Sequence, residues 1–226
     1  MTLGDAWETH AQDWIAWARS QDHDGFWGAT WPELCAVLPQ PDGLVIEIGC
    51  GEGRVGRALL GRGHAVVGIE RSATLVDAAR HAMPPLTVLR ADAARLPLRD
   101  AIASMVVACM SLHDVDDLHG TITETSRVLR PGGDFCVAMV HPFASAQDPS
   151  TMHTHHPTVS EPYLRERRFE DRVERDGLAM TFVSAHRPIS AYISALAEAG
   201  LMLTNLREFG TKPIPWLLVA RFEKLR

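Results

Sequence analysis

Apolar residues in the first two thirds of the chain form short continuous runs, separated by segments in which they recur at helical spacing. Short apolar runs indicate buried strands, expected over residues 44–48, 64–70, 86–91, 103–112 and 134–142. The intervening periodic segments predict helices over residues 54–63, 72–82 and 116–129. This alternation predicts an α/β protein with a doubly wound, Rossmann-like parallel sheet and helices on both faces.

The N-terminal segment is expected to form a helix over residues 5–19, with Asp5 as its cap. Its apolar positions follow a helical period at Trp7, Ala11, Trp14 and Ala18. Five of the six tryptophans lie within the first 31 residues. We therefore predict an aromatic N-terminal lid over residues 1–40, which packs on the core and can also form a wall over a ligand.

The regular alternation stops at residue 143. Residues 143–187 begin as a long loop and then predict two strands within 167–186, joined at Asp176-Gly177, a dipeptide typical of hairpin turns. Because ligands of such sheets bind beyond the carboxyl ends of the strands, an insertion after the fifth strand predicts a substrate cap. The chain then continues with an expected helix (190–200) and strands (201–209 and 215–222), all within a single domain, 1–226.

Composition excludes several classes of protein. The net charge of −6 argues against a nucleic-acid partner, which requires clustered lysine and arginine. No window approaches 18 apolar residues, and no basic stretch precedes an apolar one at the N-terminus, so a cytoplasmic protein without a membrane partner is expected. The four cysteines form no C-x-x-C pair, which indicates free thiols in a reducing compartment.

The segment between the first strand and the first helix after it is rich in glycine. Two spacings overlap there, G-x-G-x-x-G at Gly51, Gly53 and Gly56 and a tighter G-x-G-x-G at Gly49, Gly51 and Gly53. The first is typical of a turn that binds a pyrophosphate. However, Glu47 precedes this turn and Glu52 lies within it, and carboxylates close to a phosphate repel it. The pair of acids favours a cationic ligand.

Two further acids follow the next two strands. Glu70 ends the second strand, where an acid commonly accepts hydrogen bonds from ribose hydroxyls. Asp92 follows the third strand, where a carboxylate can accept from an exocyclic amine. The expected ligand therefore has a ribose, an adenine and a cationic tail, and S-adenosyl-L-methionine has all three.

Five ordered segments resemble the motifs of class I S-adenosylmethionine-dependent methyltransferases that act on small molecules: "VIEIGCGEGR", "VVGIE", "ADAARLPL", "VVACMSLHDVDD" and "RVLRPGGDFCVAMVHP". The resemblance is tight over residues 43–142 and looser over 188–222. One departure is Ser104, at a position where the family often has aspartate and which does not contact the ligand.

The resemblance implies a seven-stranded sheet whose last strand is antiparallel and lies next to the fifth. It implies that Glu70 binds the ribose, that Asp92 and the Ala93 backbone contact the adenine, and that a carbonyl near Cys109 binds the methionine ammonium. The expected cofactor-binding residues are Glu47, Gly49, Cys50, Gly51, Gly53, Arg54, Glu70, Arg71, Asp92, Ala93, Cys109 and Met110. The expected product is S-adenosyl-L-homocysteine.

Methyl transfer requires an approach geometry and often a base, and histidine is suited to that role near neutral pH. His113 follows the fourth strand and His141 ends the fifth, so both are catalytic candidates at the carboxyl edge of the sheet. No metal is expected. The histidines of "HTHHP" (153–157) lie in an irregular loop, and the acids after His113 do not match the spacing of magnesium-dependent catechol methyltransferases.

Three functions stay open. The favoured one is methyl transfer to an oxygen, nitrogen or carbon atom of a small molecule. The others are a methyltransferase-like protein that binds the cofactor without turnover, and a nicotinamide-dependent oxidoreductase, which would leave Glu47 and Asp92 unexplained. The acidic or aromatic runs that nucleic-acid and arginine methyltransferases carry after the fourth strand are absent from "SLHD". The sequence leaves the acceptor and the oligomeric state open.

Overall fold

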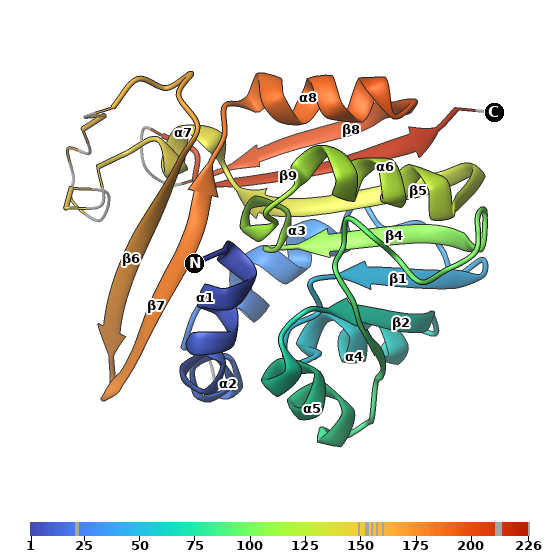
Figure 1. Cartoon of the computed structure of the whole chain (residues 1–226), viewed down its shortest axis with the longest axis horizontal. Coiled ribbons are helices and arrows are strands. Elements are labelled where there is room, and N and C mark those ends of the chain that lie inside the picture. Colours follow the sequence, from blue (N-terminus) through green and yellow to red (C-terminus); the bar gives the residue numbers. More distant parts are fainter. Residues whose placement is uncertain are drawn as a thin grey trace.

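A seven-stranded sheet forms the centre of the molecule in the computed structural model, which describes residues 1–20, 23–148, 150–151, 154, 156, 158–159, 161–210 and 214–225. Its strand order is β3-β2-β1-β4-β5-β9-β8 (Figure 1). The strands are β1 (Leu44–Ile48), β2 (Ala65–Glu70), β3 (Thr87–Arg90), β4 (Ala103–Cys109), β5 (Leu129–Val140), β8 (Leu201–Phe209) and β9 (Leu217–Lys224).

The strand directions confirm the expected topology. β1 to β5 pair in parallel, while β9 lies between β5 and β8 and is antiparallel to both. The last strand therefore lies next to the fifth, as predicted. The order reverses at β1 and β4, and in open α/β sheets ligands bind in the crevice at such a switch point.

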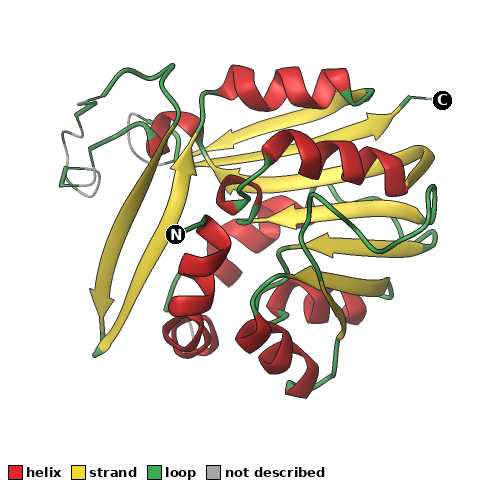
Figure 2. Cartoon of the chain, in the orientation of Figure 1, coloured by secondary structure: helices red, strands yellow, loops and turns green. Residues whose placement is uncertain are grey.

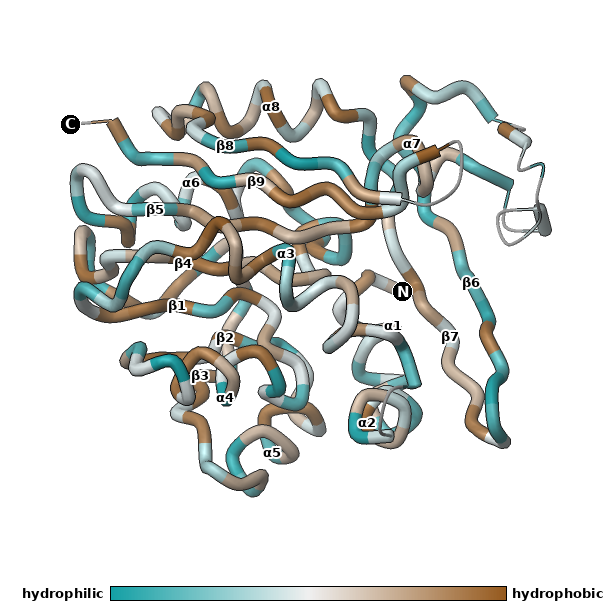
Figure 3. Tube along the Cα trace, turned by 180° about the vertical axis from the view of Figure 1, so that it is seen from behind, coloured by the Kyte–Doolittle hydropathy of each residue, from teal (hydrophilic) through white to brown (hydrophobic). Residues whose placement is uncertain are grey.

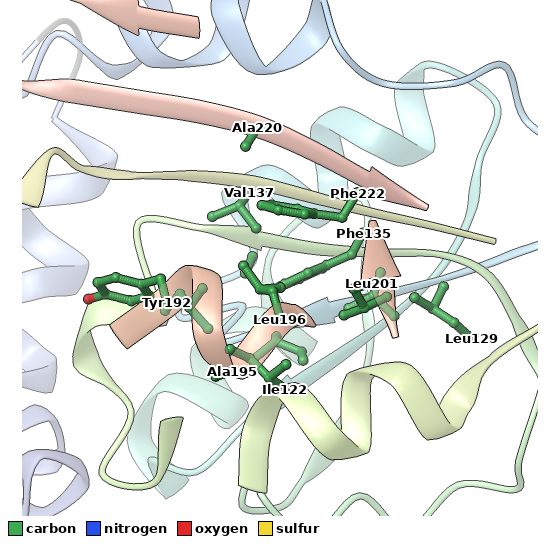
Figure 4. Packing of buried hydrophobic residues seen from close by; sticks show 14 of the residues in the cluster. Ile122, Leu129, Phe135, Val137, Tyr192, Ala195, Leu196, Leu201, Ala220 and Phe222 are labelled. Atoms are coloured by element: carbon green, nitrogen blue, oxygen red, sulfur yellow. The ribbon is translucent and has the colours of Figure 1, made fainter. Parts of the chain in front are cut away.

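Helices cover both faces of the sheet, as expected for parallel strands. The helices that follow the glycine turn and alternate with the strands are α4 (Arg54–Gly61), α5 (Ala73–His81), α6 (Leu118–Val128) and α8 (Ile189–Glu198). Buried residues of α6 and α8 belong to one apolar cluster, and those of α4 and α5 belong to the other. Ile46 and Val45 of β1 point into different clusters, as the two-residue period of a strand requires. Figure 4 shows Phe135 of the first cluster between Phe222 and Leu196.

The N-terminal segment differs from the single helix predicted over residues 5–19. It forms two helices, α1 (Leu3–Thr9) and α2 (Ala11–Arg19), which meet at His10. The helix begins earlier than predicted because Thr2 and Asp5 form a reciprocal capping box. The side chain of Asp116 also accepts hydrogen bonds from the amides of Leu3 and Gly4, which fixes the start of α1 to a distant loop. No local sequence pattern predicts this contact.

Two short helices near residue 30 were not predicted. A π-helical segment, η1 (Phe26–Thr30), leads directly into α3 (Trp31–Cys35), which has Pro32 in its first turn. Leu34 of α3 is fully buried in the same apolar cluster as α4. This segment therefore belongs to the core of the domain.

The inserted segment forms a long hairpin, separate from the main sheet (Figure 2). After a short α7 (Pro142–Ser145), the strands β6 (Arg167–Arg175) and β7 (Leu178–His186) pair as antiparallel neighbours. Asp176 and Gly177 both have positive φ, which confirms the predicted turn. β6 is largely hydrophilic apart from Phe169 and Val173, whereas β4 is largely hydrophobic (Figure 3), and the burial of the β6 residues alternates along most of the strand. One face of β6 therefore faces solvent and the other faces the protein.

Among the described residues, no helix has the length and apolar character that crossing a bilayer requires. All four cysteines are free thiols, and three of them are buried. His153 and His155 of the histidine-rich loop lie outside the described residues. Within the described ranges, no group of three or more potential metal ligands comes together.

Candidate active site

A cavity of about 470 Å³ lies at the carboxyl edge of the sheet. Its walls come from the ends of β1, β2 and β4, from the N-terminal helices and from the β6–β7 hairpin. Figure 1 shows α1, α2 and the hairpin together beyond the tips of the parallel strands. The volume is within the range of small-molecule sites, roughly 300–1,000 Å³.

All the residues expected to bind a cofactor line this cavity except Gly53. Gly53 lies directly before α4 with a φ of 90°, so it shapes the turn without facing the cavity. The structure thus brings together residues from the ends of four strands, β1, β2, β3 and β4. Which ligand they bind is not tested by this placement and stays a prediction.

The glycine turn requires conformations that other residues rarely adopt. Gly49 and Gly51 have φ values of 65° and 55°. A Cβ atom on Gly49 would come within 2.5 Å of the Ser111 side chain, whose hydroxyl donates to the Ile48 carbonyl at 2.6 Å. The turn is therefore held against the segment after β4, and only glycine fits at that contact.

Glu47 is a buried carboxyl group at the base of the turn. It is 2% exposed, and its Oε2 has no hydrogen-bond partner in the described part of the chain. Burial, together with the nearby charge of Glu52, raises the pKa of Glu47 to about 8, and Arg57 and the Gly56 amide oppose this rise only in part. A cation in the cavity would stabilise the charged form of Glu47.

Glu70 organises the turn as well as the end of β2. Its Oε2 accepts from the Gly51 amide at 3.0 Å, and its Oε1 accepts from the amides of Arg71 and Ser72 at 2.7 and 2.8 Å. Burial raises the pKa of Glu70, and these three amides oppose the rise. A carboxylate has about four acceptor positions, so one of them is left for a ligand hydroxyl.

Glu52 differs from the expectation that it would face a cationic ligand. Its Oε2 accepts from Arg19 at 3.1 Å and from Arg57 at 2.7 Å, so its charge is compensated within the protein. The Arg19 contact joins the N-terminal lid to the glycine turn. Arg19 is absent from the set of residues singled out in the sequence, because nothing local marks it as a partner of Glu52.

The residues after β3 and β4 complete the strand edge. Asp92 accepts from the Ala94 amide at 2.9 Å, which closes a tight turn and holds its carboxylate at the cavity wall. Met110 has a φ of 54°, an uncommon conformation for a residue with a side chain, and its amide donates to Ala138 at 2.7 Å. This turn exposes the end of β4 to the cavity.

Aromatic side chains from the lid and the hairpin form much of the remaining wall. The Trp14 ring lies 6.2 Å from that of Phe182 and 5.8 Å from that of Trp7, both in edge-to-face geometry. Trp17 also contacts Phe182, with centroids 6.0 Å apart. The predicted aromatic wall of the lid is therefore part of the cavity, and the hairpin supplies its other half.

His113 and Asp114 occupy η2 (Leu112–Asp114), the short helix after β4, and both line the cavity. Burial, assisted by the charge of Arg187, lowers the pKa of His113 to about 4, so the imidazole is neutral at pH 7. Its Nδ1 has no partner among the described residues. Of the two candidate histidines, His113 is the one at the site.

His141 does not line the cavity. Its Nδ1 accepts from the Phe143 amide at 3.0 Å and its Nε2 donates to Glu208 at 2.7 Å, so it caps α7 and joins it to β8. With both ring nitrogens engaged and no access to the cavity, His141 is a structural residue here and is not retained as a base. A histidine at a strand end gives no indication in sequence of which way it points.

Asp116 connects the lid, the hairpin and the strand edge. Besides the amides at the start of α1, it accepts from Arg71 at 3.0 Å and from Arg168 of β6 at 2.9 Å. Glu8 of α1 likewise bonds Ser72 and Thr74 at the start of α5. The lid is thus fixed over the cavity by side chains that cross between distant segments.

Comparison with known proteins agrees with this arrangement. Residues 46–137 match a family described as the methyltransferase domain. An uncharacterized methyltransferase of Mycobacterium bovis is 34% identical over 97 residues, 43% of this chain and 40% of that protein. A ubiquinone/menaquinone biosynthesis C-methyltransferase of a Caulobacter species is 30% identical over 132 residues, 51% of this chain and 52% of that protein. The chain thus spans about half or less of the curated relatives it matches.

Among solved structures, an S-adenosylmethionine-dependent methyltransferase from Mesorhizobium loti aligns with a TM-score of 0.67 at 23% identity, over 86% of this chain and 97% of that one. The fold therefore defines a Rossmann-like α/β protein with a cavity at the carboxyl edge of its sheet. Over residues 46–137 the chain is similar to a methyltransferase domain, and its fold is similar to that of an S-adenosylmethionine-dependent methyltransferase.

Proposed function

We propose that the protein transfers a methyl group from S-adenosyl-L-methionine to a small molecule held between the strand edge and the hairpin. The observation that carries this proposal is the single cavity wall that combines buried Glu47, Glu70 and Asp92 with the glycine turn. The cofactor supplies a methyl group that is already activated by the sulfonium. The size and aromatic lining of the cavity support a small acceptor.

The residues of the chain fit this cofactor. Glu47 lines the cavity and would bind the methionine ammonium, Glu70 has one open acceptor position for the ribose, and Asp92 would accept from the adenine amine. The lid and the hairpin both line the cavity, so they would limit the access of water to a bound substrate and restrict its orientation. Cys109 and Met110 would contribute backbone contacts at the end of β4.

Binding of S-adenosylhomocysteine tests this proposal directly. At a ligand concentration about a hundredfold above Kd, linkage predicts a rise in Tm of about 5–10 °C. NADH should leave the Tm unchanged, since its pyrophosphate would lie beside buried Glu47. Stabilisation by NADH alone would instead support the oxidoreductase alternative. Release of S-adenosylhomocysteine on a panel of small acceptors then separates an enzyme from a protein that only binds the cofactor.

Glu70→Ala should weaken binding of S-adenosylhomocysteine by on the order of 1.5–3 kcal/mol, measured by titration calorimetry. It should also lower the Tm, because three buried amides lose their acceptor. Glu70→Gln keeps one carbonyl oxygen, so its affinity for S-adenosylhomocysteine and its Tm should fall less than those of Glu70→Ala. Unchanged affinity in the alanine variant would remove Glu70 from the ribose site.

Substitutions of His141 and His113 should affect different properties of the protein. His141→Asn should lower the free energy of unfolding by about 1–3 kcal/mol, because it breaks the bond to Glu208, and leave kcat/KM nearly unchanged. His113→Asn should reduce kcat/KM while the affinity for S-adenosylhomocysteine is retained. A loss of turnover confined to His141→Asn would reverse this assignment.

A further inference from the structure

The cavity wall formed by η2 carries a largely buried carboxyl group, one oxygen of which has no hydrogen-bond partner among the described residues. The side chain of Asp114 is 10% exposed, and its Oδ1 has no hydrogen-bond partner in the described ranges. His113 Nε2 lies 3.6 Å from that oxygen, which is longer than a hydrogen bond. Burial raises the pKa of Asp114 to about 8, while a hydrogen bond from Ser184 of β7 and the charge of Arg187 oppose the rise.

The nearest guanidinium is committed to other groups. Arg187 donates to the Val115 carbonyl at 2.7 Å and to the His113 carbonyl at 3.5 Å, and it lies 3.6 Å from Glu166. It therefore braces the backbone around Asp114. Asp114 itself lines the cavity, and no arginine in the described ranges forms an ion pair with it.

The cavity as a whole carries an excess of negative charge. Eight carboxyl groups line it against three guanidinium groups. Those three are already engaged, because Arg54 pairs with Asp24, Arg71 with Asp116, and Arg175 donates to the His23 carbonyl. Asp24, Glu52 and Asp116 form ion pairs with arginines, whereas Glu47, Glu70 and Asp114 are largely buried and form none with an arginine in the described ranges. A cationic ligand would compensate these three carboxyl groups.

The aromatic wall is also suited to a cation. The Arg54 guanidinium lies 4.0 Å from the Phe26 ring centroid and 4.8 Å from that of Trp14, which is cation–π geometry. The same wall continues through Trp17 to Phe182 on β7, two residues before Ser184. An apolar or aromatic body can therefore contact these rings while its charged end reaches Asp114.

We propose that the methyl acceptor is an amine with an apolar body, and that Asp114 binds its ammonium group and accepts its proton. This inference rests on the proposed methyl transfer. The Asp114 carboxylate takes one proton from the ammonium and leaves a neutral nitrogen with a free lone pair. That lone pair forms the new N–C bond as the C–S bond breaks, with the electrons of that bond remaining on sulfur. The product leaves as a methylammonium, and the proton on Asp114 passes to solvent.

The test uses a panel of primary arylalkylamines, beginning with 2-phenylethylamine, each paired with the alcohol and the carboxylic acid of the same skeleton. Binding to the full chain saturated with S-adenosylhomocysteine is measured by calorimetry, and turnover with S-adenosylmethionine by release of S-adenosylhomocysteine. The best amine should bind at least about tenfold more tightly than its alcohol and its acid. Asp114→Asn should lose about tenfold or more in that affinity.

The control is Asp77→Asn, which removes an exposed carboxylate outside the cavity and should change neither measurement. Asp114→Asn should retain the affinity of the parent protein for S-adenosylhomocysteine, which shows that the cofactor half is folded. If S-adenosylhomocysteine binds but no amine binds better than its alcohol or acid, or Asp114→Asn keeps the preference, the acceptor assignment is wrong. Absence of S-adenosylhomocysteine binding in the parent protein would instead overturn the proposed function.

Discussion

Replacing Gly51 with valine is expected to abolish measurable binding of S-adenosylhomocysteine while leaving the sheet folded. Gly51 has a φ of 55°, where a β-branched residue is strained by roughly 1–2 kcal/mol. A Cβ atom there would also lie 3.2 Å from Trp14 Nε1, so the valine methyl groups must displace the lid or enter the cavity. Either movement also disturbs the Gly51 amide, which donates to Glu70.

Calorimetry and circular dichroism distinguish a lost site from a lost fold. Gly61→Ala is the matched control, because a Cβ atom on this glycine of α4 would have no neighbour within 4 Å. That variant should bind like the parent protein. A folded Gly51→Val protein that still binds S-adenosylhomocysteine would show that the turn does not hold the cofactor.

The sheet could be predicted because its signals are local. Apolar runs such as residues 44–48 end at glycine, and the helices between them have N-caps such as Ser72. The Asp176-Gly177 dipeptide is typical of a hairpin turn. Element ends were less accurate: the strand predicted over 103–112 ends at Cys109 because Met110 turns the chain. Periodicity does not report such a change of direction.

The N-terminal segment could not be predicted in detail because its geometry is set by distant residues. The break at His10 separates a helix fixed by Asp116 from one that packs on the hairpin. The pattern of tryptophans indicated an apolar face correctly. It could not indicate that Trp17 and Phe182, more than 160 residues apart, would meet.

The placement of the proposed cofactor-binding residues could be predicted from the sequence because parallel strands end at one edge. Once the strands are assigned, Glu47, Glu70 and Asp92 must lie at neighbouring strand ends. The acceptor half depends on side-chain direction and on the hairpin. In the sequence, Asp114 is only one of several acids after His113. The structure shows that the nearby Arg187 donates its hydrogen bonds to backbone carbonyls and forms no ion pair with Asp114 among the described residues.

Glu47→Gln is expected to stabilise the free protein at pH 8 and weaken its binding of the cofactor. Folding raises the pKa of Glu47 from about 4.5 to about 8, so the folded state holds this proton more tightly than the unfolded state. The contribution of Glu47 to stability is therefore fully present below about pH 4.5 and is lost as the pH rises towards 8. Glutamine is neutral throughout, so the variant should gain on the order of 3 kcal/mol at pH 8 and little at pH 5.

Denaturant unfolding of both proteins between pH 5 and 8 measures this difference, and Glu198→Gln, at an exposed position of α8, is the control. In the same variant, affinity for S-adenosylhomocysteine should fall about 10- to 100-fold, because the ligand ammonium loses a charged partner. The affinity of the parent protein for S-adenosylhomocysteine should rise with pH, because Glu47 releases a proton on binding. This rise should be smaller in Glu47→Gln, which has no such proton to release. A variant that is less stable at pH 8, or that binds with unchanged affinity, would show that Glu47 is not held protonated for exchange with a cationic ligand.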